Sequence, residues 1–451
     1  MSSSNTKYWT YSVALAGFLF GFDTVVISGA NLPVKELWNT SPTFHGWFIM
    51  SMALWGTVVG ALFGGIPTDR LGRKKTLLWI GILFAISAIG SALAPDPYTF
   101  SFFRFIGGLG VGASSVTVPT YLSEVSEPKE RGSIVARYQF MLVLGILIAF
   151  ISNYLLTGFG GNQDWRYMLG VEAIPAVIYS IMVMSVPGSP RWLLLYKNDE
   201  KGARSALESI GHRNIDQWIG QMKSSSTKLT EKSSQVFNSR YRKPLFLAFC
   251  IAAFNQLSGI NFVLYYAPEI FENAGLTSSE SLSSSVYIGL VNLAFTILGM
   301  YLIDRLGRKT LLFLGSLGYI ISLLMVAYAF YAGAASSLLL FSVCLFIASH
   351  AIGQGAVIWV FISEIFPTSV RANGQAWGSG THWVFAALIT AITPYFLDNT
   401  DGIFKDNAYP IFLIFAVFMV FQLLWVVFLI PETKGKSLEE IETELASRDI
   451  R

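Results

Sequence analysis

Three charged residues interrupt long apolar stretches of this 451-residue chain, namely Asp23, Arg104 and Glu172. Charges inside a membrane-spanning helix are costly, so they usually mark a function. At 1.5 Å per residue, all three lie roughly 10 Å from the outer ends of the helices that these stretches predict, so their side chains could meet. A neighbouring arginine keeps a buried carboxylate ionised, whereas desolvation alone favours the protonated form. An aspartate that loses and regains its arginine would therefore bind and release a proton.

Asp23 is accordingly our candidate for the proton site, with Arg104 as its partner and Glu172 as a second carboxylate. The alternative for Asp23 and Arg104 is a permanent ion pair that fixes two helices together. Glu172 lies near a helix end, where it could instead contact Arg166 or water.

A second set of polar residues in apolar stretches is uncharged and combines amides with aromatic rings. Amides donate and accept hydrogen bonds to hydroxyl groups, and flat rings cover C–H edges, which together suit a sugar. Each residue taken alone is more commonly a packing residue, but most of them lie in the second half of the chain. The set consists of Gln139, Asn255, Gln256, Asn261, Tyr265, Tyr266, Asn292, Trp359 and Trp383.

Gln256 and Asn261 are five positions apart, a spacing that does not put them on one face of a regular helix. We therefore expect the helix to break at Ser258-Gly259. His350 and His382 also lie in apolar stretches, and we expect each to be a neutral, hydrogen-bonded imidazole.

The composition indicates that a membrane surrounds these residues. Hydrophobic residues make up 53% of the chain and charged residues only 13%, whereas soluble proteins average about 25% charged residues. A helix needs about 20 apolar residues to cross the hydrocarbon layer, and twelve windows of the chain qualify. These windows are 8–30, 45–66, 75–95, 98–121, 132–158, 166–186, 244–270, 284–304, 310–331, 337–363, 372–397 and 409–430.

The distribution of positive charge predicts the orientation of these spans, because cytoplasmic loops are enriched in Lys and Arg. With the N-terminus inside, only Lys35, Arg166 and Lys405 of the 31 Lys and Arg residues fall in outer loops. Arg104 and Arg137 lie within spans. Twelve spans then place both termini in the cytoplasm.

Three landmarks of the chain recur in the same order at a nearly constant offset, which indicates an internal duplication. The landmarks are Asp69–Lys74 with Asp304–Lys309, both reading Asp-Arg-Leu-Gly-Arg-Lys, Glu124 and Arg131 with Glu364 and Arg371, and Pro187 with Pro431. The duplication predicts an N-terminal six-helix bundle at 1–186 and a C-terminal one at 244–430. Residues 187–243 would form a cytoplasmic linker with short helices, for which a flexible tether is the alternative, and residues 431–451 a cytoplasmic tail.

Taken in order, the motifs resemble the sugar porter family of the major facilitator superfamily across essentially the whole chain. The resemblance implies an all-α membrane protein with the major facilitator fold, in which twelve transmembrane helices form two six-helix bundles with short cytoplasmic helices between them. The motifs that carry it are Gly21-Phe22-Asp23, both Asp-Arg-Leu-Gly-Arg-Lys loops, Arg104 with Gly107-Gly108, Glu124 to Gly132, Trp165-Arg166, Pro187 to Trp192, Gln256 to Tyr266, Asn292, Trp359 to Pro367 and Pro431 to Gly435.

The resemblance also implies roles for single residues. Asp23 with Arg104 is similar to the pair of proton-coupled members, and Glu172 matches a carboxylate of the bacterial xylose transporter. Sugar contacts would come from Gln139, Asn255, Gln256, Asn261, Tyr265, Asn292, Trp359 and Trp383. A cytoplasmic gate of ion pairs, closed in the outward-facing state, would comprise Asp69, Arg70, Arg73, Glu124, Arg131, Asp304, Arg305, Arg308, Glu364 and Arg371.

Four positions depart from the family pattern and leave the identity of the sugar open. Asn255 stands in place of a glutamine, Ala356 of a proline, Ala386 of an asparagine common in glucose carriers, and Gly188 of a glutamate. A shortened or lost amide changes which sugar hydroxyls are satisfied. Glucose, xylose, galactose, fructose and related polyols are all consistent with the sequence.

Together these features predict a proton-coupled monosaccharide symporter that works by alternating access. A facilitative uniporter with the same fold is the first alternative, sodium coupling is also open, and a non-transporting sugar sensor is a further alternative. No nucleophile, metal cluster or phosphate loop occurs in a plausible site, so we expect neither an enzyme nor a bound metal or cofactor. The expected partners are a monosaccharide, a proton and the lipid bilayer, without nucleic acid, and we expect a monomer in a bacterial inner membrane.

Overall fold

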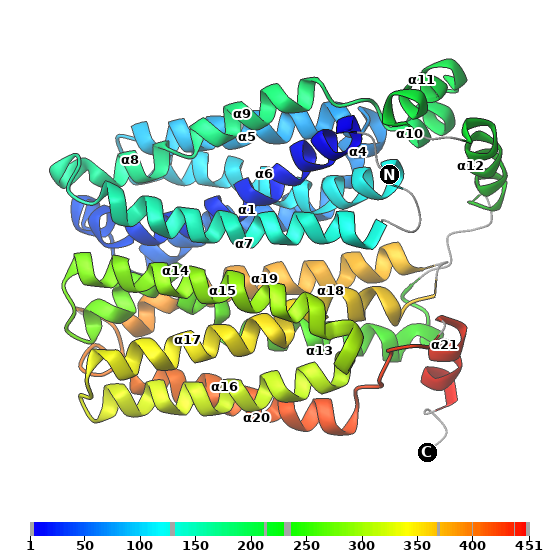
Figure 1. Cartoon of the computed structure of the whole chain (residues 1–451). Coiled ribbons are helices and arrows are strands. Elements are labelled where there is room, and N and C mark those ends of the chain that lie inside the picture. The colour runs from blue at the N-terminus through cyan, green and yellow to red at the C-terminus, as the bar shows by residue number, and fades with distance from the viewer. Residues whose placement is uncertain are drawn as a thin grey trace. The chain divides into compact units, whose positions relative to one another are not determined.

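The computed structural model describes residues 4–126, 131–211, 214–229, 236–367, 370–398, 400–436 and 438–447. In these residues the chain forms helices and no strands (Figure 1). Eleven helical segments of the described residues, three of them made of consecutive helices, are long and apolar enough to cross a membrane, or twelve if the bent pair Pro42–Met50 and Met52–Phe63 forms one span. The expectation of an all-α membrane protein is therefore confirmed.

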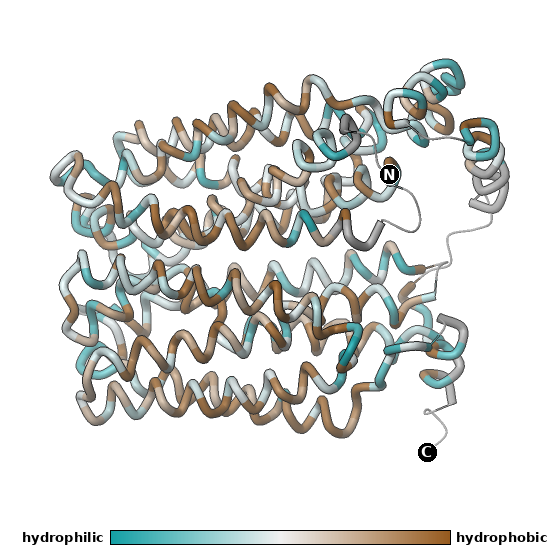
Figure 2. The backbone as a smooth tube through the Cα atoms, viewed as in Figure 1, coloured by the Kyte–Doolittle hydropathy of each residue, from teal (hydrophilic) through white to brown (hydrophobic). Residues whose placement is uncertain are grey.

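Hydrophobic residues predominate along the long helices, whereas hydrophilic residues gather at helix ends and in the short helices (Figure 2). Large apolar side chains remain exposed in the middle of these helices. Val417 and Phe421 of α20 (Tyr409–Phe428), for example, are both 54% exposed. Contiguous exposure of this kind is unfavourable in water and is expected of a surface that faces lipid.

The first half of the chain contains two predicted spans that are not continuous helices. Residues 45–66 break at Ser51 and again at Gly64, and residues 166–186 break between Gly170 and Ala173, so Glu172 lies in a turn. The elements of this half are α1 Ser4–Trp38, α2 Pro42–Phe44, the π-helix η1 His45–Met50, α3 Met52–Phe63, α4 Gly65–Arg70, α5 Arg73–Leu93, α6 Pro97–Val125, α7 Arg131–Leu156, the 3-10 helix η2 Gly161–Gln163, α8 Asp164–Gly170 and α9 Ala173–Met184.

The second half confirms the predicted break at Ser258-Gly259, where Gly259 has φ +87°. It adds a break that was not predicted, because window 337–363 is interrupted at Gly353. The elements are η3 Ser239–Tyr241, α13 Arg242–Leu257, α14 Ile260–Asn273, α15 Ser278–Leu306, α16 Arg308–Tyr331, α17 Ser336–Ile352, α18 Gln354–Glu364, α19 Arg371–Leu397, α20 Tyr409–Phe428 and α21 Leu438–Ser447.

The residues between the two halves form three short helices, α10 (Pro190–Tyr196), α11 (Glu200–Ile210) and α12 (Ile215–Leu229). The prediction of helix at Asp199–Ile210 is confirmed by α11, which Asp199 caps by accepting a hydrogen bond from Gly202 N at 2.8 Å. These helices share a small apolar core built from Leu194, Leu207 and Ile219. Their apolar faces pack together, so this described part of the linker is structured.

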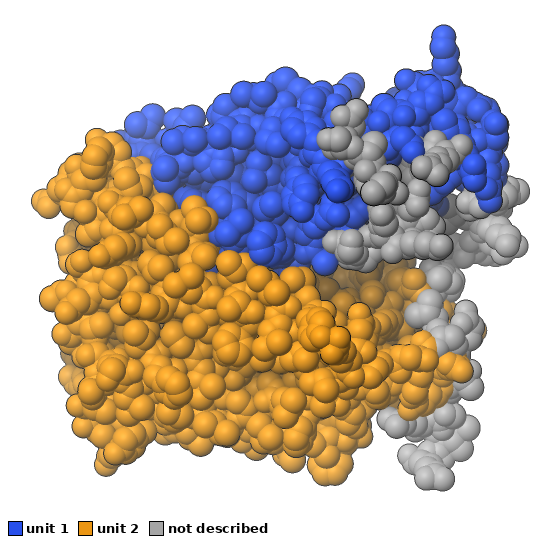
Figure 3. Space-filling view, in the orientation of Figure 1, with its two compact units in different colours: residues 1–24, 55–146, 169–233 blue, residues 25–54, 147–168, 234–451 orange. Residues whose placement is uncertain are grey.

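Contacts divide the chain into two compact units (Figure 3). Unit 1 comprises residues 1–24, 55–146 and 169–233, and unit 2 comprises residues 25–54, 147–168 and 234–451. The predicted division into bundles at 1–186 and 244–430 follows the repeat and not these contacts, so it stays a prediction.

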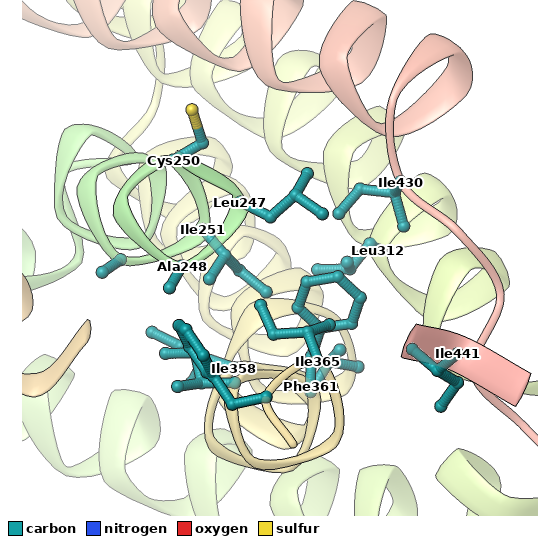
Figure 4. Close-up of a cluster of buried hydrophobic side chains, with 14 of the residues drawn as sticks. Leu247, Ala248, Cys250, Ile251, Leu312, Ile358, Phe361, Ile365, Ile430 and Ile441 are labelled. Atoms are coloured by element: carbon teal, nitrogen blue, oxygen red, sulfur yellow. The ribbon is translucent and has the colours of Figure 1, made fainter. Parts of the chain in front are cut away.

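Within unit 2, a buried apolar cluster joins α13, α16 and α18 to α21. Leu247, Leu312 and Phe361 lie in this cluster together with Ile430 and with Ile441 of α21 (Figure 4). Apolar side chains that pack this closely hold together the elements that carry them. The described helix α21 is therefore packed onto the other helices of unit 2.

Candidate functional site

An ion pair inside unit 1 joins two of the predicted proton-coupling residues. Arg104 Nη1, on α6, lies 2.5 Å from Asp23 Oδ1, on α1, and Arg104 Nη2 donates a hydrogen bond to Asp23 O at 3.1 Å. Both side chains are 2% exposed. The arginine thus binds both the side chain and the backbone of α1 at this position.

Glu172 belongs to the same group of charges. It is 1% exposed, lies in the turn between α8 and α9, and has Asp23 and Arg104 as its electrostatic neighbours. Its Oε1 atom accepts no hydrogen bond among the described residues. Two buried carboxylates therefore face one guanidinium, and when both are ionised the group carries one negative charge that a proton would neutralise.

In unit 2, Gln256 is the centre of a buried group of polar side chains. Its Nε2 atom lies 3.0 Å from Asn255 Oδ1 and 3.1 Å from a ring nitrogen of His382 on α19. Gln256 Oε1 accepts no hydrogen bond among the described residues, although it is buried. A buried carbonyl oxygen without a donor is an acceptor that a ligand hydroxyl would satisfy.

Two tryptophans frame the His382 ring. The centroid of Trp383 lies 4.8 Å away at a near-perpendicular angle of 87°, and that of Trp359 on α18 lies 5.0 Å away. Trp359 is 39% exposed, so part of its indole is open to contact. Amides, an imidazole and an accessible aromatic ring thus converge from α13, α18 and α19.

The remaining residues predicted to contact sugar occupy other helices. Asn261 and Tyr265 are buried on α14, beyond the break at Gly259. Asn292 is buried on α15, where its Oδ1 accepts a hydrogen bond from Thr296 Oγ1 at 3.5 Å. Gln139 is half-buried on α7 and belongs to unit 1.

His382 is the residue of this group that sequence reasoning missed. The expectation that it is hydrogen-bonded is confirmed, but its partner is Gln256, one of the predicted sugar contacts. The available signal was its position directly before Trp383 in an apolar stretch. His350 is also hydrogen-bonded, since its Nδ1 lies 2.5 Å from Tyr319 Oη.

The predicted gate residues of unit 1 form a buried bidentate ion pair. Arg73 Nη2 lies 2.9 Å from Glu124 Oε1, and Arg73 Nε lies 3.0 Å from Glu124 Oε2. Arg73 Nη1 also donates to Asp69 Oδ1 at 3.1 Å. Arg70 is exposed beside this cluster, and Arg131 begins α7 with a side chain outside the described part.

Unit 2 contains the same arrangement in the second copy of the motif. Arg308 Nη2 and Nε lie 2.8 and 3.1 Å from the two oxygens of Glu364, and Arg308 Nη1 lies 3.2 Å from Asp304 Oδ1. Arg305 stacks on Tyr301, and Arg371 donates to Phe366 O at 3.3 Å. Two-pronged charge-assisted bonds of this kind fix direction as well as distance.

The recurring proline motifs complete both clusters in the same way. Ser189, after Pro187, donates to Glu124 Oε2 at 2.5 Å, and Thr433, after Pro431, donates to Glu364 Oε2 at 2.6 Å. Each gate carboxylate is therefore held by an arginine and by a hydroxyl. The two copies of the sequence repeat thus build matching local geometry.

Comparison with known proteins identifies the family. The profile described as "Sugar (and other) transporter" matches residues 9–445. The chain therefore belongs to the sugar transporter family. This transporter is 36% identical to the arabinose-proton symporter of Bacillus subtilis, over 96% of this chain and 93% of the relative. It is 37% identical to the glucose transporter GlcP of Staphylococcus epidermidis, over 96% of each protein.

Solved structures of one relative share the fold. A structure of the xylose transporter XylE from E. coli, in a partially occluded inward-open conformation, is 29% identical, covers 96% of this chain and 100% of its own, and gives a TM-score of 0.84. A second structure gives a TM-score of 0.80. It is described as the major facilitator superfamily proton:xylose symporter XylE bound to 6-bromo-6-deoxy-D-glucose. The transporter thus has the major facilitator fold and crosses the membrane several times, and the expectation of a transport protein rather than an enzyme is confirmed.

Proposed function

We propose that this transporter carries a monosaccharide together with a proton by alternating access. The observation that carries the proposal is the buried group of Asp23, Arg104 and Glu172, with two carboxylates against one guanidinium. Protonation of Asp23 would weaken its bond to Arg104 and free α1 from α6. The relatives named as arabinose-proton and xylose-proton symporters support the same coupling.

The sugar site of this proposal centres on Gln256. Its unsatisfied Oε1 would accept a hydrogen bond from one sugar hydroxyl, His382 would exchange a hydrogen bond with another, and the open face of Trp359 would cover a C–H edge. The further contacts would come from Asn255, Asn261, Tyr265, Asn292 and Trp383. The sugar itself is a hexose or a pentose.

The gate of this proposal consists of the paired clusters around Arg73 and Arg308. Their bidentate bonds to Glu124 and Glu364 would hold the cytoplasmic side closed in the outward-facing state and break when it opens. The other charged residues of the gate would shift the equilibrium between the outward-facing state and the state that is open to the cytoplasm. These residues are Asp69, Arg70, Arg131, Asp304, Arg305 and Arg371. In this proposal their role is conformational, because the bonds form in one state of the transporter and break in the other.

The proposed arrangement in the cell follows from the distribution of charge in the loops. Two six-helix bundles, at 1–186 and 244–430, would cross a bacterial inner membrane with both termini in the cytoplasm. We propose a monomer as the working unit.

The test is transport in proteoliposomes. Counterflow of radiolabelled hexoses and pentoses identifies the sugar, and uptake under an imposed pH gradient shows whether it is concentrated. Asp23→Asn should keep counterflow and lose accumulation, whereas Asp96→Asn, the same change outside the spans, should keep both. If the wild type only equilibrates the sugar whatever the gradient, the protein is a uniporter and the Asp23–Arg104 pair is structural.

A further inference from the structure

The junction between α17 and α18 determines where Trp359 lies. α17 ends at Ile352, Gly353 has φ −83° and ψ −99°, and α18 begins at Gln354. Gly353 packs against Gly315 of α16, since a Cβ added to Gly353 would lie 2.9 Å from Gly315 Cα. Such a close approach leaves no room for a side chain at the junction. α16 is therefore the support against which this break rests.

Tyr319 lies one turn further along α16 and is fully buried. Its Oη atom is 2.5 Å from His350 Nδ1 on α17, and Ser258, at the other helix break, is the further polar side chain that faces it. The His350 ring reaches across the Gly353 break, because its Cδ2 and Nε2 atoms lie 3.3 and 3.4 Å from the position of a Cβ added to Gly355. Tyr319 thus holds a side chain that touches both sides of the junction.

A phenylalanine and a leucine would fill similar volumes without polar atoms. Burying a hydroxyl and an imidazole is costly unless they bond to each other, and the bond then fixes a direction that apolar packing does not. We propose that Tyr319 and His350 are positioning residues, which fix the α17–α18 junction and so hold Trp359 against His382 in the sugar site. This inference rests on the proposed function, because the Trp359–His382 contact matters here as part of a sugar site.

Equilibrium binding of the transported sugar to purified protein, with thermal unfolding of the same samples, tests the inference. Tyr319→Phe and His350→Leu should each raise the Kd about tenfold, the effect of one lost buried hydrogen bond. His350→Asn should bind like the wild type, since its amide can occupy the Nδ1 position. The double variant Tyr319→Phe with His350→Leu should be no weaker than either single variant.

Tyr179→Phe is the matched control. Tyr179 is a fully buried tyrosine of unit 1 whose hydroxyl has no partner among the described residues, so its loss should leave the Kd unchanged. Three results would overturn this inference and leave the proposed function standing. The first is an unchanged Kd in Tyr319→Phe, and the second is a Kd of His350→Asn as high as that of His350→Leu. The third is a double variant whose effects on the Kd add. Failure of the wild type to bind any hexose or pentose would overturn the proposed function as well.

Discussion

At the scale of single residues, several polar side chains of this transporter are buried and bonded to one another. Asn31 of α1 is an example within unit 2. Its Nδ2 donates to Glu269 Oε2 at 2.7 Å, and its Oδ1 accepts from His45 Nε2, also at 2.7 Å. All three residues are at most 4% exposed. One amide thus satisfies two groups that are distant in sequence.

Asn31→Ala should therefore be strongly destabilising. It leaves Glu269 and His45 without this partner, and each unsatisfied buried group costs about 1–3 kcal/mol. We expect a clearly lower thermal midpoint in detergent. Asn273→Ala is the control, because Asn273 makes a longer bond of 3.3 Å to the neutral Leu397 O and is half-buried. An equal drop of the thermal midpoint in the two variants would show that the hydrogen bonds of Asn31 to Glu269 and His45 contribute no more to stability than the single bond of Asn273.

Asp96 gives a prediction that depends on pH. It lies outside the spans, and its carboxylate accepts hydrogen bonds from Thr99 Oγ1 at 2.6 Å and from the backbone of Thr99 and Tyr98 at 3.0 and 2.9 Å. These bonds, led by the Thr99 hydroxyl, lower the pKa of Asp96 below its ordinary value of 3.8. Stability from a lowered pKa is complete above the ordinary value and is lost as the pH falls through the folded-state value.

Asp96→Ala should accordingly unfold at a lower temperature than the wild type at neutral pH, and the difference should narrow once the pH falls below 3.8. Thermal unfolding followed at several pH values measures this difference. A gap of constant size across the acidic range would mean that the charge of Asp96 contributes nothing.

At the scale of elements, some helix breaks can be predicted from sequence and others cannot. The break at Gly259 could be predicted from the spacing of Gln256 and Asn261. Two residues five positions apart can contact the same ligand only if the helix changes direction between them. The break at Gly353 has no such signal, because its cause is the close contact with Gly315 on another helix. A contact between distant segments leaves no trace in the local hydropathy.

Gly259 should be sensitive to substitution for two separable reasons. Its φ of +87° disfavours any side chain, and a Cβ would lie 2.8 Å from the Phe415 ring. Gly275 has nearly the same φ, +89°, but open space around it. Gly275→Ala should cost about 1–2 kcal/mol for the backbone alone, and Gly259→Ala more than this. Thermal unfolding of both variants measures the two losses of stability. Similar losses would mean that the Phe415 ring moves away from the added Cβ without cost.

At the scale of the whole molecule, the sequence repeat predicts ion pairs that occur in both halves of the chain. It does not predict contacts between side chains that occur in one half. Both copies of Asp-Arg-Leu-Gly-Arg-Lys place their second arginine on a glutamate with the same geometry. His382 could not be predicted in the same way, because a lone histidine in an apolar stretch looks like a packing residue until its contacts with Gln256 and Trp359 are known. The polar pair of Tyr319 and His350 was hidden for the same reason.

The repeat also contains an asymmetry that can be tested. Glu432 accepts hydrogen bonds from the backbone N–H groups of Arg308 and Lys309, each at 3.0 Å, and so caps α16. In the first half of the chain the residue equivalent to Glu432 is Gly188, one position after Pro187, and it has no side chain that could cap α5 in this way. Gly188→Glu should stabilise the protein by about 0.5–2 kcal/mol through this cap, and Gly188→Gln by less.

The thermal midpoints of the two Gly188 variants and of Gly188→Ala measure this effect. The alanine variant separates the change in backbone freedom from the cap. A thermal midpoint of Gly188→Glu no higher than that of Gly188→Ala would contradict the prediction. It would mean that the indole of Trp192, which lies against Gly72, already occupies the space that the carboxylate needs.

The central claim is that sugar and proton move together through the group around Asp23, and proton movement evoked by sugar tests it most directly. Proteoliposomes would be held at equal pH on both sides, and the external pH recorded while a sugar that passes the counterflow test is added outside. We predict that the medium becomes alkaline with the wild type and stays unchanged with Asp23→Asn. A wild type that moves the sugar without any change in external pH would contradict the account.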